Sequence, residues 1–176
     1  FKEGLNYIIE LNKNGTFIVE GYSALLLKRI LTPFATGFVD LQSPAGVGIA
    51  AAIYDYDGSV YVSDEGRMMA RLKNYVFRLG NVNEHTHEEM FNGEKLHSII
   101  RDACNECLPG CAECVFQPYC GADPVRNMSE QGDMIGHRPT NEMCKKNKAI
   151  MQYLFELIRK NDPDINRIFW SWLNCG

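Results

Sequence analysis

Apolar residues recur at helical spacing in the opening part of the chain. Leu5 and Ile9 lie about one turn apart, and the following Asn14-Gly15 pair is typical of a helix stop. A second helix is predicted over residues 22 to 31, where leucines supply apolar surface until a Thr-Pro pair ends it. The pattern therefore predicts two helices at the start of the chain.

The pattern changes from helical to strand-like in the middle of the chain. GVGIAAAIY, which begins at Gly46, is small and apolar, YDYDG supplies a turn, and SVYVS resumes as a strand. Gly58 in this turn suits a position with positive φ. A polar stretch with LGNVNEHTHEE then leads to a helix over residues 94 to 103, whose apolar residues follow a helical period. This region should form a β-hairpin followed by a helix.

A long polar segment and a final long helix follow. Residues 121 to 139 are rich in Gly, Pro and Asp and predict a loop. Thr140 is then a predicted N-cap, with Glu142 and Cys144 in the first turn of the helix. The apolar face of this helix consists of Met151, Leu154, Phe155 and Ile158.

Composition and charge restrict the classes of function. The chain has 176 residues, of which 45% are hydrophobic, enough to bury one core. Its formal net charge is -4 and no run of Lys or Arg stands out, which argues against nucleic acid and favours small or peptidic partners. No apolar run approaches the roughly 20 residues that a membrane helix needs. We therefore expect a soluble protein that binds neither nucleic acid nor a membrane.

Cysteine is concentrated in one part of the sequence. Five of the seven cysteines fall between Cys104 and Cys120, and none precedes Cys104. An odd, clustered set without a secretion signal argues against disulfides and favours reduced thiolates that hold a metal in the cytoplasm. We therefore expect a cytoplasmic α+β protein in which a small β-hairpin is followed by a cysteine-rich metal-binding knuckle with flanking α-helices.

Two cysteine spacings overlap in this segment. Cys107, Cys111 and Cys114 form C-x3-C-x2-C, the spacing that binds the catalytic cluster in radical S-adenosylmethionine (SAM) enzymes. Glu113 stands where that motif normally has an aromatic residue, and 176 residues with one hairpin cannot build the β/α barrel that carries it. We interpret this spacing as a coincidental match and expect no catalytic residue in the chain.

The second spacing is that of a four-thiolate site. Cys111-x2-Cys114-x5-Cys120 is followed, after 23 intervening residues, by Cys144. A C-x2-C pair lets two thiolates converge from one turn, and a helix start favours a thiolate at Cys144. Four thiolates without a histidine suit either tetrahedral zinc or a [4Fe-4S] cluster, and the spacing alone does not separate them.

The cysteine motif and the segments before it resemble one known domain. C-x2-C-x5-C with a later cysteine is similar to the second auxiliary-cluster motif of the SPASM domain, the C-terminal extension of radical SAM enzymes that modify peptides and proteins. SPAGVGIAAAIYDYDGSVYVS resembles the hairpin of that domain, and LGNVNE resembles the stretch after it. The resemblance covers roughly residues 43 to 158 and implies a [4Fe-4S] cluster bound by Cys111, Cys114, Cys120 and Cys144.

The chain departs from this pattern at positions that would bind a first auxiliary cluster. Ser43 and Ser63 stand where the family has cysteines, and Pro124 stands where a further cysteine would follow Cys120. These ligands are missing together, whereas the ligands of the second cluster are all present. The resemblance therefore implies one auxiliary cluster.

A narrower resemblance concerns the radical SAM maturase of the His-Xaa-Ser system. GCAECVFQPYCGADPV, GHRPTNEMC and the ending IFWSWL are similar to that family. Because the chain begins at Phe1 in a helical pattern without a leader, we expect a fragment whose missing N-terminal barrel binds SAM. Residues 1–42 would be a helical linker from this barrel, residues 43–160 the SPASM-like domain and residues 161–176 an aromatic tail. The expected partners are that barrel and a peptide or protein substrate.

Three functions are open at this point. The favoured one is an auxiliary [4Fe-4S] domain that transfers electrons or positions the substrate and is not catalytic alone. The second is a zinc-stabilised module that recruits a protein through its aromatic tail, and zinc is also expected to compete for the site in an isolated fragment. The third, a self-sufficient radical SAM enzyme, requires the coincidental spacing at Cys107.

Other reactive residues have a structural interpretation beside the chemical one. Cys104 and Cys107 form a possible further half-site, but free or partly buried thiols are expected, and Cys175 is expected to be a bystander. His85 and His87 form an H-x-H in an acidic stretch, which we assign to a solvated loop.

A structural role is also expected for residues on either side of the knuckle. His97 and His137 are expected to form hydrogen bonds, and Asp123 is expected to support the loop. The aromatic run at 168–173 is expected either to be buried or to form a surface for a partner.

Overall fold

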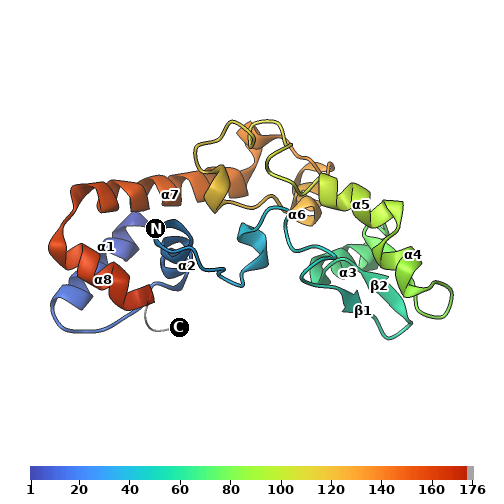
Figure 1. Cartoon of the computed structure of the whole chain (residues 1–176), viewed down its shortest axis with the longest axis horizontal. Coiled ribbons are helices and arrows are strands. Elements are labelled where there is room, and N and C mark those ends of the chain that lie inside the picture. Colours follow the sequence, from blue (N-terminus) through green and yellow to red (C-terminus); the bar gives the residue numbers. More distant parts are fainter. Residues whose placement is uncertain (174–176) are drawn as a thin grey trace. The chain divides into compact units, whose positions relative to one another are not determined.

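The computed structural model describes residues 1–173, which form helices and one small sheet (Figure 1). The chain divides into two compact units: a helical unit, Phe1–Phe38 with Glu142–Gly176, and a sheet unit, Val39–Asn141. The sheet is three-stranded and antiparallel, so the predicted α+β class is confirmed. Within residues 1–173, no helix has the length and apolar character needed to cross a bilayer. The assignment of 1–42, 43–160 and 161–176 to separate functional regions stays a prediction.

The helical unit contains α1 (Lys2–Lys13), α2 (Gly21–Leu31), α7 (Glu142–Lys160) and α8 (Pro163–Leu173). Helix α8 contacts the other three, and α2 also contacts α7. The side chains of its core are 3% exposed or less: Leu5, Ile9, Leu26, Leu27, Met151, Leu154, Phe169 and Trp172. Burial of these apolar faces holds the four helices together.

Both predicted opening helices are confirmed, with their stops. Asn14 follows the last turn of α1, and Gly15 has a φ of 87°, a conformation that glycine adopts without strain. The start of α2 has a cap that the apolar pattern did not reveal. The Glu20 carboxylate accepts hydrogen bonds from the backbone N–H groups of Tyr22 and Ser23, at 3.3 and 2.7 Å.

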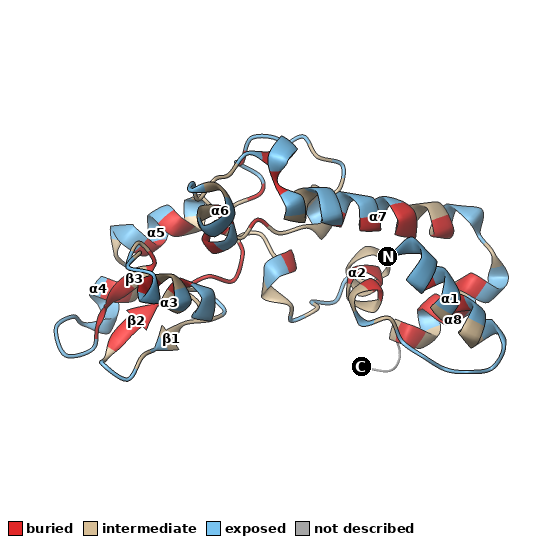
Figure 2. Cartoon of the chain, turned by 180° about the vertical axis from the view of Figure 1, so that it is seen from behind, coloured by how far each residue is buried: buried red, intermediate tan, exposed pale blue. Residues whose placement is uncertain are grey.

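The sheet unit contains β1 (Ile53–Tyr54), β2 (Ser59–Tyr61) and β3 (Arg78–Asn81) in the order β1-β2-β3. Its helices are α3 (Asp64–Arg71), α4 (His87–Phe91), α5 (Glu94–Arg101) and α6 (Pro124–Gln131). Short 3-10 turns lie at Val39–Leu41, Gln117–Tyr119 and Arg138–Thr140. Strand β2 and most of β3 are buried, whereas β1 is a partly exposed edge (Figure 2).

The predicted hairpin is confirmed, but its first strand is shorter than the apolar run suggests. Tyr54 pairs with Val60, and Gly58 has the predicted positive φ, 83°. The start of the run forms tight turns instead of a strand. A Cβ on Gly46 would lie 2.6 Å from the Cβ of Val39, and Gly48 has a φ of 68°. These glycines allow close packing and a bend that a continuous strand does not contain.

The region predicted as a loop over residues 121–139 contains helix α6, so that prediction is wrong. The Asp123 carboxylate accepts a hydrogen bond from the Val125 N–H at 2.8 Å, Pro124 occupies the first turn, and Gly132 ends the helix with a φ of 74°. Asp, Pro and Gly are loop formers in general, but in this order they are also helix cap residues. The predicted N-cap at Thr140 is also wrong, because α7 begins at Glu142 and Asn141 precedes it.

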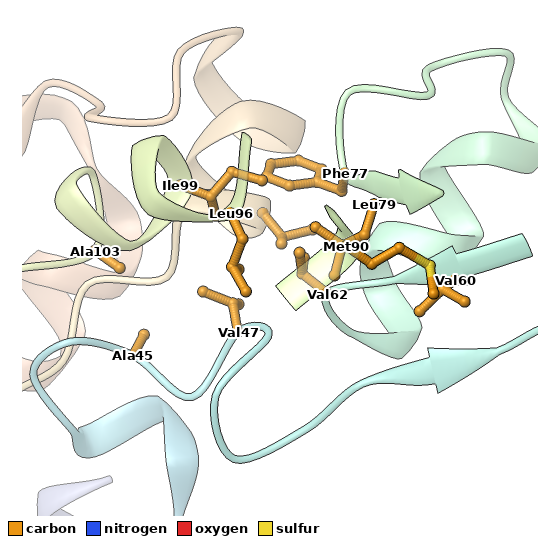
Figure 3. Close-up of a cluster of buried hydrophobic side chains, with 11 residues drawn as sticks. Ala45, Val47, Val60, Val62, Phe77, Leu79, Met90, Leu96, Ile99 and Ala103 are labelled. Carbon is orange, nitrogen blue, oxygen red and sulfur yellow. The ribbon is translucent and has the colours of Figure 1, made fainter. Parts of the chain in front are cut away.

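The core of the sheet unit lies between the sheet and its helices (Figure 3). The residues that are 2% exposed or less include Val60 of β2, Val62 directly after β2, Phe77 directly before β3, and Leu96 and Ile99 of α5. Figure 3 shows Leu96 and Ile99 beside Phe77. The predicted helix at 94–103 is confirmed as α5, and its apolar face packs into this core.

Replacing Thr86 with alanine should destabilise the sheet unit by about 1 kcal/mol. The Thr86 hydroxyl accepts a hydrogen bond from the Glu89 N–H at 3.3 Å, while the Glu89 carboxylate accepts one from the Thr86 N–H at 2.7 Å. These two hydrogen bonds form the capping box at the N-terminus of α4. Urea denaturation followed by circular dichroism measures the loss. Ser98→Ala on the exposed face of α5 is the control, and an equal loss in both variants would contradict the capping role.

Candidate metal centre

The cysteine segment is built from a succession of tight turns. Cys107 N–H donates to the Cys104 carbonyl at 3.0 Å, and Cys114 N–H donates to the Cys111 carbonyl at 2.9 Å. Each C-x2-C pair is therefore closed by a hydrogen bond between its first and last residue. Such a turn holds two cysteine side chains on neighbouring positions, which is the arrangement expected of a metal-binding knuckle.

Cys120 is held by a buried side chain that the sequence reasoning missed. The Asn105 side-chain amide donates to the Cys120 carbonyl at 2.7 Å, and Asn105 is 1% exposed. The Asn105 N–H donates in turn to the Ser43 hydroxyl at 2.9 Å. The sequence signal is an asparagine inside the first C-x2-C pair, because a buried amide needs partners for its polar atoms, but this signal does not identify Cys120 as the partner.

Close packing next to Cys120 also depends on a glycine. A Cβ on Gly121 would lie 2.1 Å from the carbonyl oxygen of Asp40, so no other residue fits without a backbone shift. Pro118 lies in the 3-10 turn immediately before Cys120. The backbone around this cysteine is therefore fixed on both sides.

A polar network links residues on either side of the cysteine segment to Glu106 within it. The Glu106 carboxylate accepts from the Gln117 side-chain amide at 2.7 Å and from the Ser43 hydroxyl. The hydrogen bond from Ser43, followed by the other hydrogen bonds, lowers the pKa of Glu106, so this carboxylate carries a charge beside the cysteine segment.

The cysteines differ in their surroundings. Cys111, Cys114, Cys120 and Cys144 are half-buried, whereas Cys107 is exposed. Burial raises the pKa of the Cys104 thiol, and the Glu106 carboxylate and Cys107 raise it further. Cys104 is therefore a protonated thiol of low reactivity at neutral pH.

Cys144 lies in the first turn of α7, as predicted, and so belongs to the helical unit, whereas the other predicted ligands belong to the sheet unit. Among residues 1–173, no group of three or more His, Cys, Asp or Glu side chains has an arrangement that could hold a metal ion. The thiol chemistry of the donor set fits zinc or an iron–sulfur cluster. The ligand set Cys111, Cys114, Cys120 and Cys144 stays a prediction.

Three residues that stand where the resembled pattern has cysteines, Ser43, Ser63 and Pro124, have structural contacts of their own. The Ser63 hydroxyl accepts from the Gly66 N–H at 3.1 Å and caps α3. Ser43 holds the Asn105 N–H and Glu106, and Pro124 starts α6. Each of these side chains therefore supports an element of the sheet unit.

The histidines lie at the surface and Asp123 has the structural role expected of it, whereas a hydrogen-bonding role for His97 stays a prediction. All four histidines are exposed, and His137 Nδ1 lies 3.0 Å from the Thr140 hydroxyl. His87 is not in a loop, because it begins α4. Asp123 supports its segment as the cap of α6.

The aromatic run forms the end of α8. Phe169 and Trp172 are buried in the helical unit, whereas Trp170 is 49% exposed. Burial is therefore confirmed for part of the run. Cys175 lies outside the described residues.

A scan against protein-family models and a search of curated proteins find no match to this chain. Comparison with solved structures finds a radical SAM enzyme with a similar fold, with a TM-score of 0.56 over 97% of this chain. That structure is polyhistidine-tagged anSMEcpe, an anaerobic sulfatase-maturating enzyme, with bound AdoMet. The two sequences are 21% identical, so the likeness is one of fold, and this chain spans 41% of that enzyme.

Proposed function

We propose that this chain is the auxiliary-cluster region of a radical SAM enzyme that modifies a peptide or protein. The observation that carries the proposal is the fold likeness to anSMEcpe, which extends over 97% of the chain and includes the cysteine segment. The SPASM-like cysteine spacing supports the same conclusion independently of the fold. SAM itself would be bound by a barrel outside these residues, and this chain alone would not be catalytic.

The proposed ligands of one [4Fe-4S] cluster are Cys111, Cys114, Cys120 and Cys144. The closed turn at Cys111 to Cys114 and the fixed backbone at Cys120 present thiols from defined positions, and Cys144 adds a thiol from the first turn of α7. Metal binding at such a site would add to the stability of the cysteine segment. When bound, a cluster with four thiolate ligands supplies one-electron transfer.

A single cluster is supported by the contacts of Ser43, Ser63 and Pro124. Each occupies a position where the two-cluster pattern has a cysteine. The two serines form hydrogen bonds with backbone N–H groups, and Pro124 is the first residue of α6. The narrower proposal, that the enzyme is the maturase of the His-Xaa-Ser system, rests on the sequence motifs around Cys120 and Cys144 and not on the fold comparison.

Anaerobic reconstitution of the chain with iron and sulfide tests the proposal. We expect about four irons and about four sulfides per chain, with visible absorption that bleaches on reduction. The zinc alternative predicts tight binding of one zinc, no visible absorption and unfolding by a chelator. Preferential retention of zinc after reconstitution with both metals would exclude the redox role.

A further inference from the structure

A groove with a volume of about 530 Å³ opens along α3 and α6 in the sheet unit. Its apolar wall is formed by Met68, Met69, Leu72 and Val125. Met68 is 59% exposed and Leu72 is 82% exposed, so large apolar side chains stand open to solvent at the groove. A volume of this size lies within the range of ligand-binding pockets.

The charged residues of the groove are mainly acidic. Four carboxylates and two guanidinium groups line it, and the two guanidinium groups have acidic partners of their own. Arg71 pairs with Asp55 at 2.8 Å and lies over the Tyr56 ring, 5.4 Å from its centroid. Arg126 pairs with Glu130 at 3.5 Å. Asp40, Glu65 and Asp123 contribute the other carboxylates of the groove lining, beside its apolar wall.

These carboxylates lie close enough to affect one another. Burial raises the pKa of Asp123, the backbone hydrogen bonds of the α6 cap oppose this change, and the carboxylates of Asp40 and Glu65 raise the pKa further. A cation placed among the three groups would relieve this repulsion. The groove is thus complementary to a ligand with both positive charge and apolar surface.

We propose that the groove binds a lysine-containing, apolar peptide segment. A lysine side chain has an aliphatic stem that matches Met68 and Leu72 and an ammonium group that matches the carboxylates. An open groove with protruding side chains also suits a peptide more than an enclosed small molecule. The choice of a peptide rests on the proposed function, whereas the charge of the groove does not depend on the cluster.

Fluorescence anisotropy of the full chain with a labelled peptide of alternating leucine and lysine tests this site. A matched peptide with glutamate in place of lysine is expected to bind at least about tenfold more weakly. Glu65→Gln and Asp123→Asn should each weaken lysine-peptide binding by about fivefold, and asparagine preserves the α6 cap. Glu88→Gln, at an exposed carboxylate of α4, is the control for the general negative charge of the protein and should leave binding unchanged.

Equal binding of the two peptides, or an equal effect of Glu65→Gln and Glu88→Gln, would overturn the groove proposal. Iron analysis of the same samples tests the groove proposal and the auxiliary-cluster proposal separately. Peptide binding with the expected variant effects but without a cluster supports the groove and contradicts the auxiliary-cluster role. A cluster without selective peptide binding gives the opposite result.

Discussion

Replacing Cys120 with serine should reduce the iron retained after anaerobic reconstitution from about four per chain to less than about one. A serine hydroxyl is a poor ligand at neutral pH, and Cys120 is the proposed ligand whose backbone is most firmly held, through Asn105 and Gly121. Loss of this thiolate exposes one iron in a site that has no other ligand for it, and the exposed cluster should lose its iron and sulfide during gel filtration. Iron and sulfide analysis after gel filtration, together with visible absorption, measures the loss.

Cys144→Ser is the decisive companion variant, because Cys144 is the proposed ligand that belongs to the helical unit. It should lose the cluster as Cys120→Ser does. Cys104→Ser is the matched control, since burial and nearby groups keep that thiol protonated, and it should retain the full iron content. If Cys144→Ser retained its full iron content and Cys104→Ser lost it, the proposed ligand set would be wrong.

Phe77→Ala should destabilise the sheet unit by about 3 to 5 kcal/mol. The Phe77 side chain is fully buried, and a Cβ on Gly66 would lie 3.0 Å from the Phe77 Cβ, so α3 packs directly against it. Truncation removes apolar contact and leaves a cavity among the valines of the sheet and the apolar face of α5. The expected loss is a large part of the stability of a small domain.

Urea denaturation of the apo chain measures this loss, with circular dichroism as the signal. Tyr75→Ala, two residues away and 54% exposed, is the control and should change the free energy of unfolding by less than about 0.5 kcal/mol. A loss below about 1.5 kcal/mol in Phe77→Ala would show that the core collapses around the missing ring or that other contacts dominate the unit.

The elements that the sequence predicts well are those with a strong local signal. The opening helices, α5 and the hairpin turn at Gly58 follow from apolar period and turn residues. Strand β3 was missed because its four residues include a charged arginine and a glycine. A Cβ on Gly80 would lie 2.8 Å from the Met90 side chain, so this strand depends on close packing against the next helix, α4, that the apolar pattern does not record.

The candidate centre shows the same division between local and long-range information. The cysteine spacings and the position of Cys144 in a first helical turn could be read from the sequence. The link from Asn105 to Cys120 could not, since it joins residues through a buried side chain and not through spacing. The groove also escaped prediction, because its carboxylates come from separate segments that only the fold brings together.

The cap that Ser63 provides for α3 has a consequence for engineering additional thiols into this chain. Ser63→Cys would exchange a good helix-capping hydroxyl for a poorer acceptor. Ser43→Cys would likewise loosen the Asn105 backbone. Each such substitution therefore weakens the sheet unit before an added ligand could compensate for the lost hydrogen bond.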